Sequence, residues 1–377
     1  MKIVFLLPLL ISLAGFSQVQ KLKPGNFKPG FISITRFDQS REPVREQPVG
    51  ATGRTIQINL WYPSEGNGEK MNFAAYTSLA GLELDTSSKL NAIQSGIEKY
   101  FAWPASLGAD KKKFIDFLEQ KKPMLASAAA KWLKPGYPLI ILVHGFAADF
   151  AFMAEWLSGH GYIVMQVPVK VTTTYDLDYE GKGLESQIAD YEFALNIIRD
   201  EYDVTTSSIG VAGFSFGGQS AVALALRNPD IKAIVSLDGG IGSVFGSQLL
   251  GMQKNYEDRK IIQPVLHLYN AKDRHTDLNW FYRTRNTDRY LVAMKNMEHG
   301  HFTSFGLLNE VVPGIMGKQV ADPGDGYEAT MAMTKTFMDE CLKSRKVSPS
   351  RLLASMQDEY PWIRACIEKA ELKTRGT

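Results

Sequence analysis

Short apolar runs alternate with longer amphipathic segments over most of the sequence, and this alternation limits the folds that the chain can adopt. The strand-like runs lie at 138–143, 162–168, 208–212, 232–237, 264–269 and 290–294. The helical patterns lie at 148–160, 184–202, 216–227, 277–286, 326–344 and 359–373. Such alternation predicts an α/β fold with a mostly parallel central sheet and helices on both faces. The runs at 138–143 and 209–212 are apolar throughout, as is typical of strands buried on both sides.

Two further strands are expected upstream, at 31–36 and 55–62. The alternation of polar and apolar residues from Thr55 to Trp61 predicts an antiparallel ribbon at the edge of the sheet. Residues 71–135 then interrupt the pattern with two amphipathic segments, 86–101 and 111–133. We therefore expect a helical insertion, which either caps the functional site or packs on the sheet edge.

The N-terminus has the pattern of a targeting segment. Met1-Lys2 is followed by an apolar run of 12 residues, Ile3 to Ala14, and then by small residues before Gln18. This pattern predicts a signal peptide over 1–17, and the run is shorter than the roughly 20 residues that span a bilayer. The expected product is one exported domain of residues 18–377, periplasmic or secreted, with no membrane span. The alternative is a buried N-terminal strand or an uncleaved anchor.

The composition excludes several classes of partner. A net charge of +2 without a dense Lys/Arg cluster argues against nucleic acid as a partner. Phosphate-binding and dinucleotide fingerprints are absent from the sequence. Cys341 and Cys366 lack metal-ligand spacing, and they either pair in an oxidising compartment or remain buried thiols. We therefore expect no cofactor and no metal, and no sequence feature indicates an oligomeric state.

The strand that ends at Gly213 runs into Phe214-Ser215-Phe216-Gly217 and then into a helical pattern. A Gly-x-Ser-x-Gly segment between strand and helix is typical of a nucleophile elbow, a sharp turn that exposes a serine hydroxyl. The helix N-terminus adds backbone N–H groups and a favourable dipole where negative charge develops. Ser215 is thus the candidate nucleophile. The alternative is an ordinary glycine-rich turn in a non-catalytic protein.

His144-Gly145-Phe146 directly follows the strand at 138–143. A chain that leaves a central strand here can direct the backbone N–H of Phe146 at a substrate oxyanion, with the N–H of Phe216 as the second donor. His144 precedes the nucleophile, whereas this fold orders its triad as serine, acid and histidine. We therefore expect His144 to hold the loop through a side-chain hydrogen bond.

The general base is sought among the histidines that follow Ser215, which are His267, His275, His299 and His301. His267 lies inside the strand at 264–269, where a packed strand residue is expected, and His275 lies in the charged loop after it. His299 follows the strand at 290–294 by a short link, which favours it as the base. His301, two residues further on, is the alternative.

Two aspartates are candidates for the acid. Asp238 ends the strand at 232–237, and Asp273 follows the next strand. A carboxylate at either place could orient the imidazole and stabilise the imidazolium. The residues alone leave both open.

Residues 138–308 resemble the platelet-activating-factor acetylhydrolase family and its bacterial relatives in the α/β-hydrolase superfamily. The matching segments are 138–145, 208–218, 234–238 and 299–305, and 54–63 is similar to the edge strand of exported bacterial hydrolases. The resemblance implies Asp238 as the acid, His299 as the base, and Phe146 and Phe216 as the oxyanion donors. Phe214 replaces a histidine that is frequent in the family, and Asp273 remains an alternative acid.

The predicted function is hydrolysis of a small-molecule or lipid-like carboxylic ester through an acyl-enzyme. Several aromatic residues near the predicted site favour an apolar acyl or alcohol group; they are Phe146, Phe150, Phe152, Phe214 and Phe216. A peptidase and a dienelactone-type hydrolase on the same fold are alternatives, because fold does not fix function. A secreted binding protein with a disused site is the alternative outside the enzymes.

Overall fold

The computed structural model describes residues 21–43, 52–82, 89–133, 136–168, 181–254, 256–317, 322–343, 351, 353–354, 357–358 and 360–371. The signal peptide predicted over 1–17 lies outside these residues. Within the described part of the chain, no helix combines the length and apolar character that crossing a bilayer requires.

The described strands form one sheet of eleven strands in the order β11-β10-β9-β8-β7-β5-β6-β2-β1-β4-β3. Its central strands are β5 (Leu139–Val143), β6 (Ile163–Gln166), β7 (Ile209–Phe214), β8 (Ile231–Leu237), β9 (Val265–Asn270) and β10 (Arg289–Met294). Each neighbouring pair among these six is parallel. The prediction of a mostly parallel central sheet is therefore confirmed.

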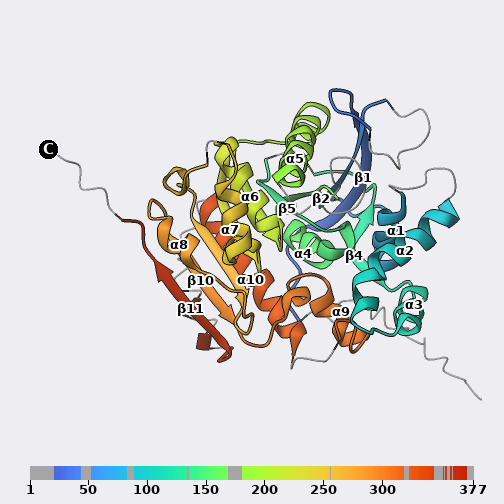
Figure 1. Ribbon diagram of the computed structural model, residues 1–377. Helices are drawn as coiled ribbons and strands as arrows, with labels where there is room; N and C mark the ends of the chain where they lie inside the picture. Colours follow the sequence, from blue (N-terminus) through green and yellow to red (C-terminus); the bar gives the residue numbers. More distant parts are fainter. Residues whose placement is uncertain are drawn as a thin grey trace, which may run out of the picture.

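Helices cover both faces of the sheet, as predicted (Figure 1). They are α4 (Ala147–Gly159), α5 (Gly181–Tyr202), α6 (Gly217–Arg227), α7 (Val244–Gly251), α8 (Asn279–Arg283), α9 (Phe305–Val311) and α10 (Pro323–Lys343). Strand β5 shows how one strand serves two cores. Ile140 and Leu142 pack into the core that contains α4 and α10, whereas Leu139, Ile141 and Val143 pack into the core that contains α5 and α6.

The N-terminal ribbon forms as predicted, but it does not lie at the edge of the sheet. Strand β1 (Lys28–Asp38) pairs antiparallel with β2 (Arg54–Ser64) along the full length of both strands. Strand β2 also pairs with β6, so both of its sides are occupied. The alternating polar side chains were misleading because Gln57 and Asn59 are buried and bond to each other and to Gln166 rather than to water.

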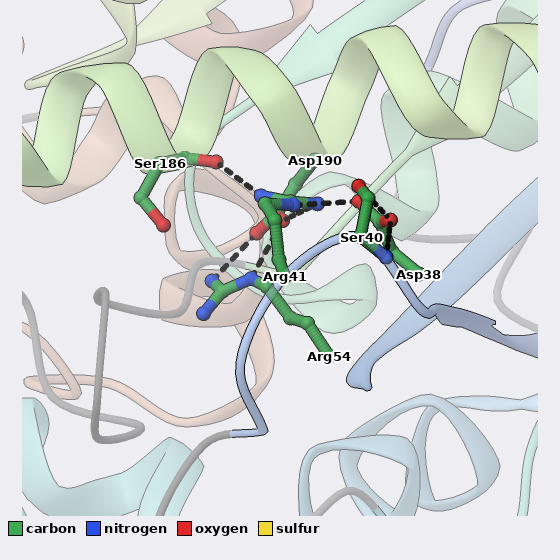
Figure 2. Close-up of polar contacts among 6 residues, drawn as sticks. All are labelled: Asp38, Ser40, Arg41, Arg54, Ser186 and Asp190. Atoms are coloured by element: carbon green, nitrogen blue, oxygen red, sulfur yellow. Dashed lines mark hydrogen bonds and ion pairs between the residues drawn. The ribbon is translucent and has the colours of Figure 1, made fainter. Parts of the chain in front are cut away.

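A buried ion-pair network fastens this ribbon to α5 (Figure 2). Arg54 donates from Nε to Asp190 Oδ1 at 2.7 Å and from Nη2 to Oδ2 at 2.8 Å, and both side chains are buried. Arg41 bridges the same carboxylate, at 2.8 Å, and Asp38 Oδ2, at 2.6 Å. A bidentate guanidinium–carboxylate contact fixes geometry as well as charge. The network therefore holds the start of β2 and the end of β1 against the helix.

The insertion contains strands as well as helices. It comprises β3 (Lys70–Asn72), α1 (Phe73–Leu82), α2 (Lys89–Ser106), α3 (Lys111–Glu119) and β4 (Pro123–Ala128). The helix predicted over 111–133 is therefore wrong beyond residue 119. Lys121 adopts φ 45°, and Pro123 cannot continue a helix, so the chain turns into β4 instead. Strand β4 pairs with β1 and β3 at the end of the sheet.

A buried carboxyl group ties the insertion to the main body. Glu155 on α4 accepts hydrogen bonds from Tyr76 Oη on α1 at 2.7 Å and from the Leu125 N–H on β4 at 2.6 Å. Burial raises the pKa of Glu155 to about 7. One side chain thus fixes both a helix and a strand of the insertion against α4, the helix that begins just after the loop at 144–146.

The C-terminal segment also differs from its prediction. The described residues within 359–373 contain strand β11 (Ile363–Glu368), which pairs antiparallel with β10, instead of a helix. Pairing with the exposed side of β10 satisfies the backbone groups that helix formation would have satisfied. Cys366 lies on this strand and Cys341 on α10, and both are free thiols.

Candidate active site

Ser215 occupies a strained turn between β7 and α6. Its φ is +51°, in the left-handed region, where a non-glycine residue costs about 1–3 kcal/mol. The flanking glycines are required by close packing. A Cβ on Gly213 would lie 2.0 Å from the Gly217 carbonyl oxygen, and a Cβ on Gly217 would lie 2.3 Å from that of Val143. The local geometry is therefore that of a nucleophile elbow.

The structure brings Ser215, His299 and Asp238 together in one hydrogen-bonded chain. His299 Nε2 lies 2.9 Å from Ser215 Oγ, and His299 Nδ1 lies 2.7 Å from Asp238 Oδ2. The Asn270 N–H donates to Asp238 Oδ1 at 2.8 Å, which fixes the orientation of the carboxylate. The Asp238 side chain is 8% exposed and that of His299 is 44% exposed. The imidazole is thus held at Nδ1 by the buried Asp238 carboxylate, while much of the ring is exposed to solvent.

The competing acid and base have other partners. Asp273 is exposed and accepts a hydrogen bond from the N–H of His275 at 2.9 Å. His301 is buried, and its Nδ1 accepts the Glu298 N–H at 3.1 Å. Burial lowers the pKa of His301 to about 4, so this imidazole is neutral near pH 7. The geometry accordingly favours Asp238 and His299 over these alternatives.

His267 is a packed strand residue, as predicted, but it also lines the site cavity. Its ring stacks on Tyr269 and Phe281, and its Nδ1 lies 2.9 Å from Ser236 Oγ. Burial lowers the pKa of His267 to about 4. Its place in the cavity wall could not be read from the sequence, because the loop that faces it, near Gly242, is remote along the chain.

The predicted oxyanion donors differ in their surroundings. Phe216 is the N-cap residue of α6 and directly follows Ser215, as the prediction requires. The N–H of Phe146 instead donates to Asp149 Oδ2 at 2.7 Å. It is therefore engaged by a side chain of its own helix, α4, and an oxyanion would have to share it. The sequence carries a signal for this hydrogen bond: Asp149 lies three residues after Phe146, the N-cap residue of α4, which is the spacing of a capping box.

A series of buried amides supports the loop that contains Gly145. Gln57 Nε2 donates to Asn59 Oδ1 at 3.2 Å, Asn59 Nδ2 to Gln166 Oε1 at 2.8 Å, and Gln166 Nε2 to the Gly145 carbonyl at 2.7 Å. The hydrogen bond predicted from His144 is not seen at Nδ1, which has no partner among the described residues. Burial lowers the pKa of His144 to about 3, so the ring is a neutral packing group.

A cavity of about 210 Å³ opens beside Ser215. Besides the three hydrogen-bonded residues, its wall includes Phe216, Gln219, Ser243, Phe245, His267, Tyr269, Asp273 and Thr276. The wall mixes aromatic rings with hydroxyl and amide groups. Such a space suits a compact group with some polar character rather than a long alkyl chain.

Asp149 gives the loop at 144–146 a pH-dependent support. Burial raises its pKa to about 7, so the folded chain keeps a proton there that the unfolded chain loses near pH 4. Stability from this group is full below pH 4 and declines as pH rises to about 7. We expect Asp149→Asn, which retains an acceptor for the Phe146 N–H, to become more stable relative to the wild type over this interval. Urea unfolding at pH 4–8 measures the difference, which can change by up to about 1.4 kcal/mol per pH unit.

The buried histidines titrate in both proteins and cancel from that difference. Asp273→Asn, at an exposed carboxylate, is the matched control for exchanging a carboxylate for an amide. A difference for Asp149→Asn that stays flat across pH 4–8 would contradict the raised pKa.

Comparison with known proteins finds sequence similarity to thioesterases and cutinases. The family model "BAAT / Acyl-CoA thioester hydrolase C terminal" matches residues 187–299. Acyl-coenzyme A thioesterase 1 of Mus musculus is 31% identical over 140 residues, which cover 36% of this chain and 30% of that protein. Cutinase 2 of Thermobifida cellulosilytica is 30% identical over 107 residues, which cover 28% of this chain and 37% of that protein. The chain thus spans about a third of the length of these curated relatives.

A solved structure matches nearly the whole chain. It is a ferulic acid esterase from Streptomyces cinnamoneus, with a TM-score of 0.64, 19% identity, and coverage of 92% of this chain and 97% of that one. Together with the parallel sheet, the covering helices and the elbow, this similarity shows that the chain has the α/β-hydrolase fold. The α/β-hydrolase fold expected from the sequence is thereby confirmed.

Proposed function

We propose that the chain is a serine hydrolase that cleaves carboxylic esters through an acyl-enzyme. The observation that carries this proposal is the continuous hydrogen-bonded chain from Asp238 through His299 to Ser215 on a strained elbow. A serine hydroxyl is a weak nucleophile unless an adjacent base takes its proton, and the base must be held in the correct tautomer. The esterases and thioesterases among the similar proteins support the same class of reaction.

In the proposed acylation, Ser215 Oγ attacks the ester carbonyl while its proton passes to His299 Nε2. The resulting oxyanion is stabilised by the Phe216 N–H at the start of α6, with the Phe146 N–H as a second donor shared with Asp149. The bond from the acyl carbon to the alcohol oxygen then breaks, and His299 returns the proton to that oxygen. Asp238 keeps Nδ1 protonated and stabilises the imidazolium.

In the proposed deacylation, a water molecule replaces the alcohol. His299 removes a proton from the water as its oxygen attacks the acyl carbon, and the proton then passes to Ser215 Oγ as the acid leaves. The same residues act in both steps, so a change that damages the triad should slow both.

The substrate that the site favours is an ester with a compact acyl group, because the cavity beside Ser215 holds about 210 Å³. Thioester hydrolysis is the second candidate, favoured by the match of residues 187–299 to an acyl-CoA thioester hydrolase model. We further propose a single α/β-hydrolase domain over 18–377, exported after removal of 1–17. The pattern of Lys2 followed by an apolar run supports export.

A fluorophosphonate probe tests the proposal. We expect the probe to attach to Ser215, located by mass spectrometry of the labelled peptide, and to abolish hydrolysis of p-nitrophenyl acetate in proportion to labelling. A panel of p-nitrophenyl acetate, longer acyl esters, an acetyl thioester and a peptide anilide then ranks the substrate classes by kcat/KM. Folded protein that is not labelled and hydrolyses nothing in the panel would favour a binding protein with a disused site.

A further inference from the structure

An exposed tryptophan from the insertion lies against the candidate base. Trp103, near the end of α2, is 37% exposed. Its ring centroid is 6.1 Å from that of His299, with an angle of 63° between the ring planes. Residue 103 lies 196 positions before His299 in the sequence, so only the fold of the insertion brings the two rings together. The insertion thus reaches the candidate base as well as extending the sheet edge.

The position of Trp103 is fixed by its neighbours. Phe305 packs against it edge-on, at 5.9 Å and 86°, and itself stacks on Tyr100 of α2 at 5.0 Å. A Cβ on Gly300 would lie 3.0 Å from Trp103 Cη2, so the histidine loop approaches the indole as closely as a glycine permits. The indole is therefore packed on one side, while the residue as a whole stays 37% exposed.

The chemistry divides the site into two sides. In acylation, the alcohol oxygen must receive the proton from His299 Nε2, so the leaving group lies beside this imidazole. The acyl group stays bonded to Ser215, and we assign it to the 210 Å³ cavity, whose wall of Phe245, Tyr269 and Thr276 does not include Trp103. Trp103 is adjacent to the base and outside the acyl cavity.

We propose that Trp103 forms the wall of a leaving-group subsite that prefers esters of aromatic or bulky apolar alcohols. The inference rests on the proposed function and specifies the half of the substrate that departs first. Covering the exposed part of the indole would remove on the order of 80 Å² of apolar surface from water, equivalent to about 30-fold in binding. Methyl and ethyl leaving groups are too small to cover it and gain little.

The test uses esters that share one acyl group. We compare methyl acetate with 2-naphthyl acetate and take the ratio of wild-type to variant kcat/KM for each, so that the intrinsic reactivity of the ester cancels. Trp103→Ala should lower kcat/KM for 2-naphthyl acetate by about tenfold or more and for methyl acetate by less than about twofold. Trp103→Phe should restore most of the loss. Phe37→Ala removes an exposed aromatic residue on β1 and is the matched control.

Deacylation separates this role from a structural one. After the alcohol has departed, hydrolysis of the acetyl-enzyme, measured as the steady-state rate after an acylation burst, should be unchanged in Trp103→Ala. Loss that is uniform across the esters, or that slows deacylation as well, would mean that Trp103 only supports His299 and would overturn the inference. No loss with either ester would overturn it too. Hydrolysis that survives Ser215→Ala would instead overturn the proposed function.

Discussion

Replacing Ser215 with alanine is expected to lower kcat for p-nitrophenyl acetate by about 10⁴- to 10⁶-fold. The substitution removes the proposed nucleophile, the hydroxyl oxygen that lies 2.9 Å from His299 Nε2. Alanine fits the same turn, because it is smaller than serine and meets the same strain at φ +51°. The residual rate should be that of oxyanion stabilisation and binding alone. The measurement is steady-state kinetics on protein purified away from endogenous esterases.

The matched control for that experiment is Ser247→Ala, which removes a serine hydroxyl on α7 that donates to the Val244 carbonyl. Its kcat should remain within about twofold of the wild type, since surface changes away from the site rarely alter more. A Ser215→Ala protein that keeps more than about a hundredth of the wild-type kcat would contradict a nucleophilic role.

The second large effect is expected from Asp238→Asn, which should lower kcat by about 10⁴-fold while Asp273→Asn lowers it by a few-fold at most. The reason lies in the two oxygens of Asp238. The Asn270 N–H holds Oδ1, so an asparagine that keeps this bond must turn its amide NH₂ toward His299 Nδ1. The imidazole then carries its proton on Nε2 and cannot accept the proton of Ser215. The measurement compares kcat/KM of both variants over pH 5–9.

Circular dichroism and urea unfolding of both variants establish that the folds are equal. Asp273→Asn is the matched control because Asp273 also lines the cavity, yet it is exposed and bonded to the His275 N–H. A larger loss in Asp273→Asn than in Asp238→Asn would reverse the assignment of the acid.

Local patterns predicted the central sheet well. The strands at 138–143, 208–212 and 264–269 are mostly apolar runs, and each forms within about two residues of its expected bounds. The misassigned segments are β4 and β11, which are short, amphipathic and compatible with either period. Their choice of strand depends on pairing with β1 and β10, which are remote in sequence. Pairing with remote strands, rather than local periodicity, therefore determines that these two segments are strands.

The same division holds at the site. Ser215 and His299 carry local signals, a glycine-flanked turn and a position after a strand, and the structure brings them to 2.9 Å. The sequence predicted the Phe146 N–H as an oxyanion donor, but in the structure it donates to Asp149. This was missed because a phenylalanine has no capping side chain and so does not mark a helix start, where capping competes with the oxyanion role. The hydrogen bond from Asn59 to Gln166 joins residues that are 107 positions apart, and a single sequence carries no local signal for such a contact.

The buried Glu155 carboxyl attaches the insertion to the main body of the chain, which carries the proposed triad. Residues 71–135 bring Trp103 beside His299, while the proposed nucleophile, acid and base all come from 215–299. Glu155 on α4 accepts hydrogen bonds from α1 and from β4, so two elements of the insertion are attached to the main body through one side chain. If Trp103 forms the proposed leaving-group wall, substitutions on the solvent side of α2 would change the preference for the alcohol while Ser215, Asp238 and His299 stay in place.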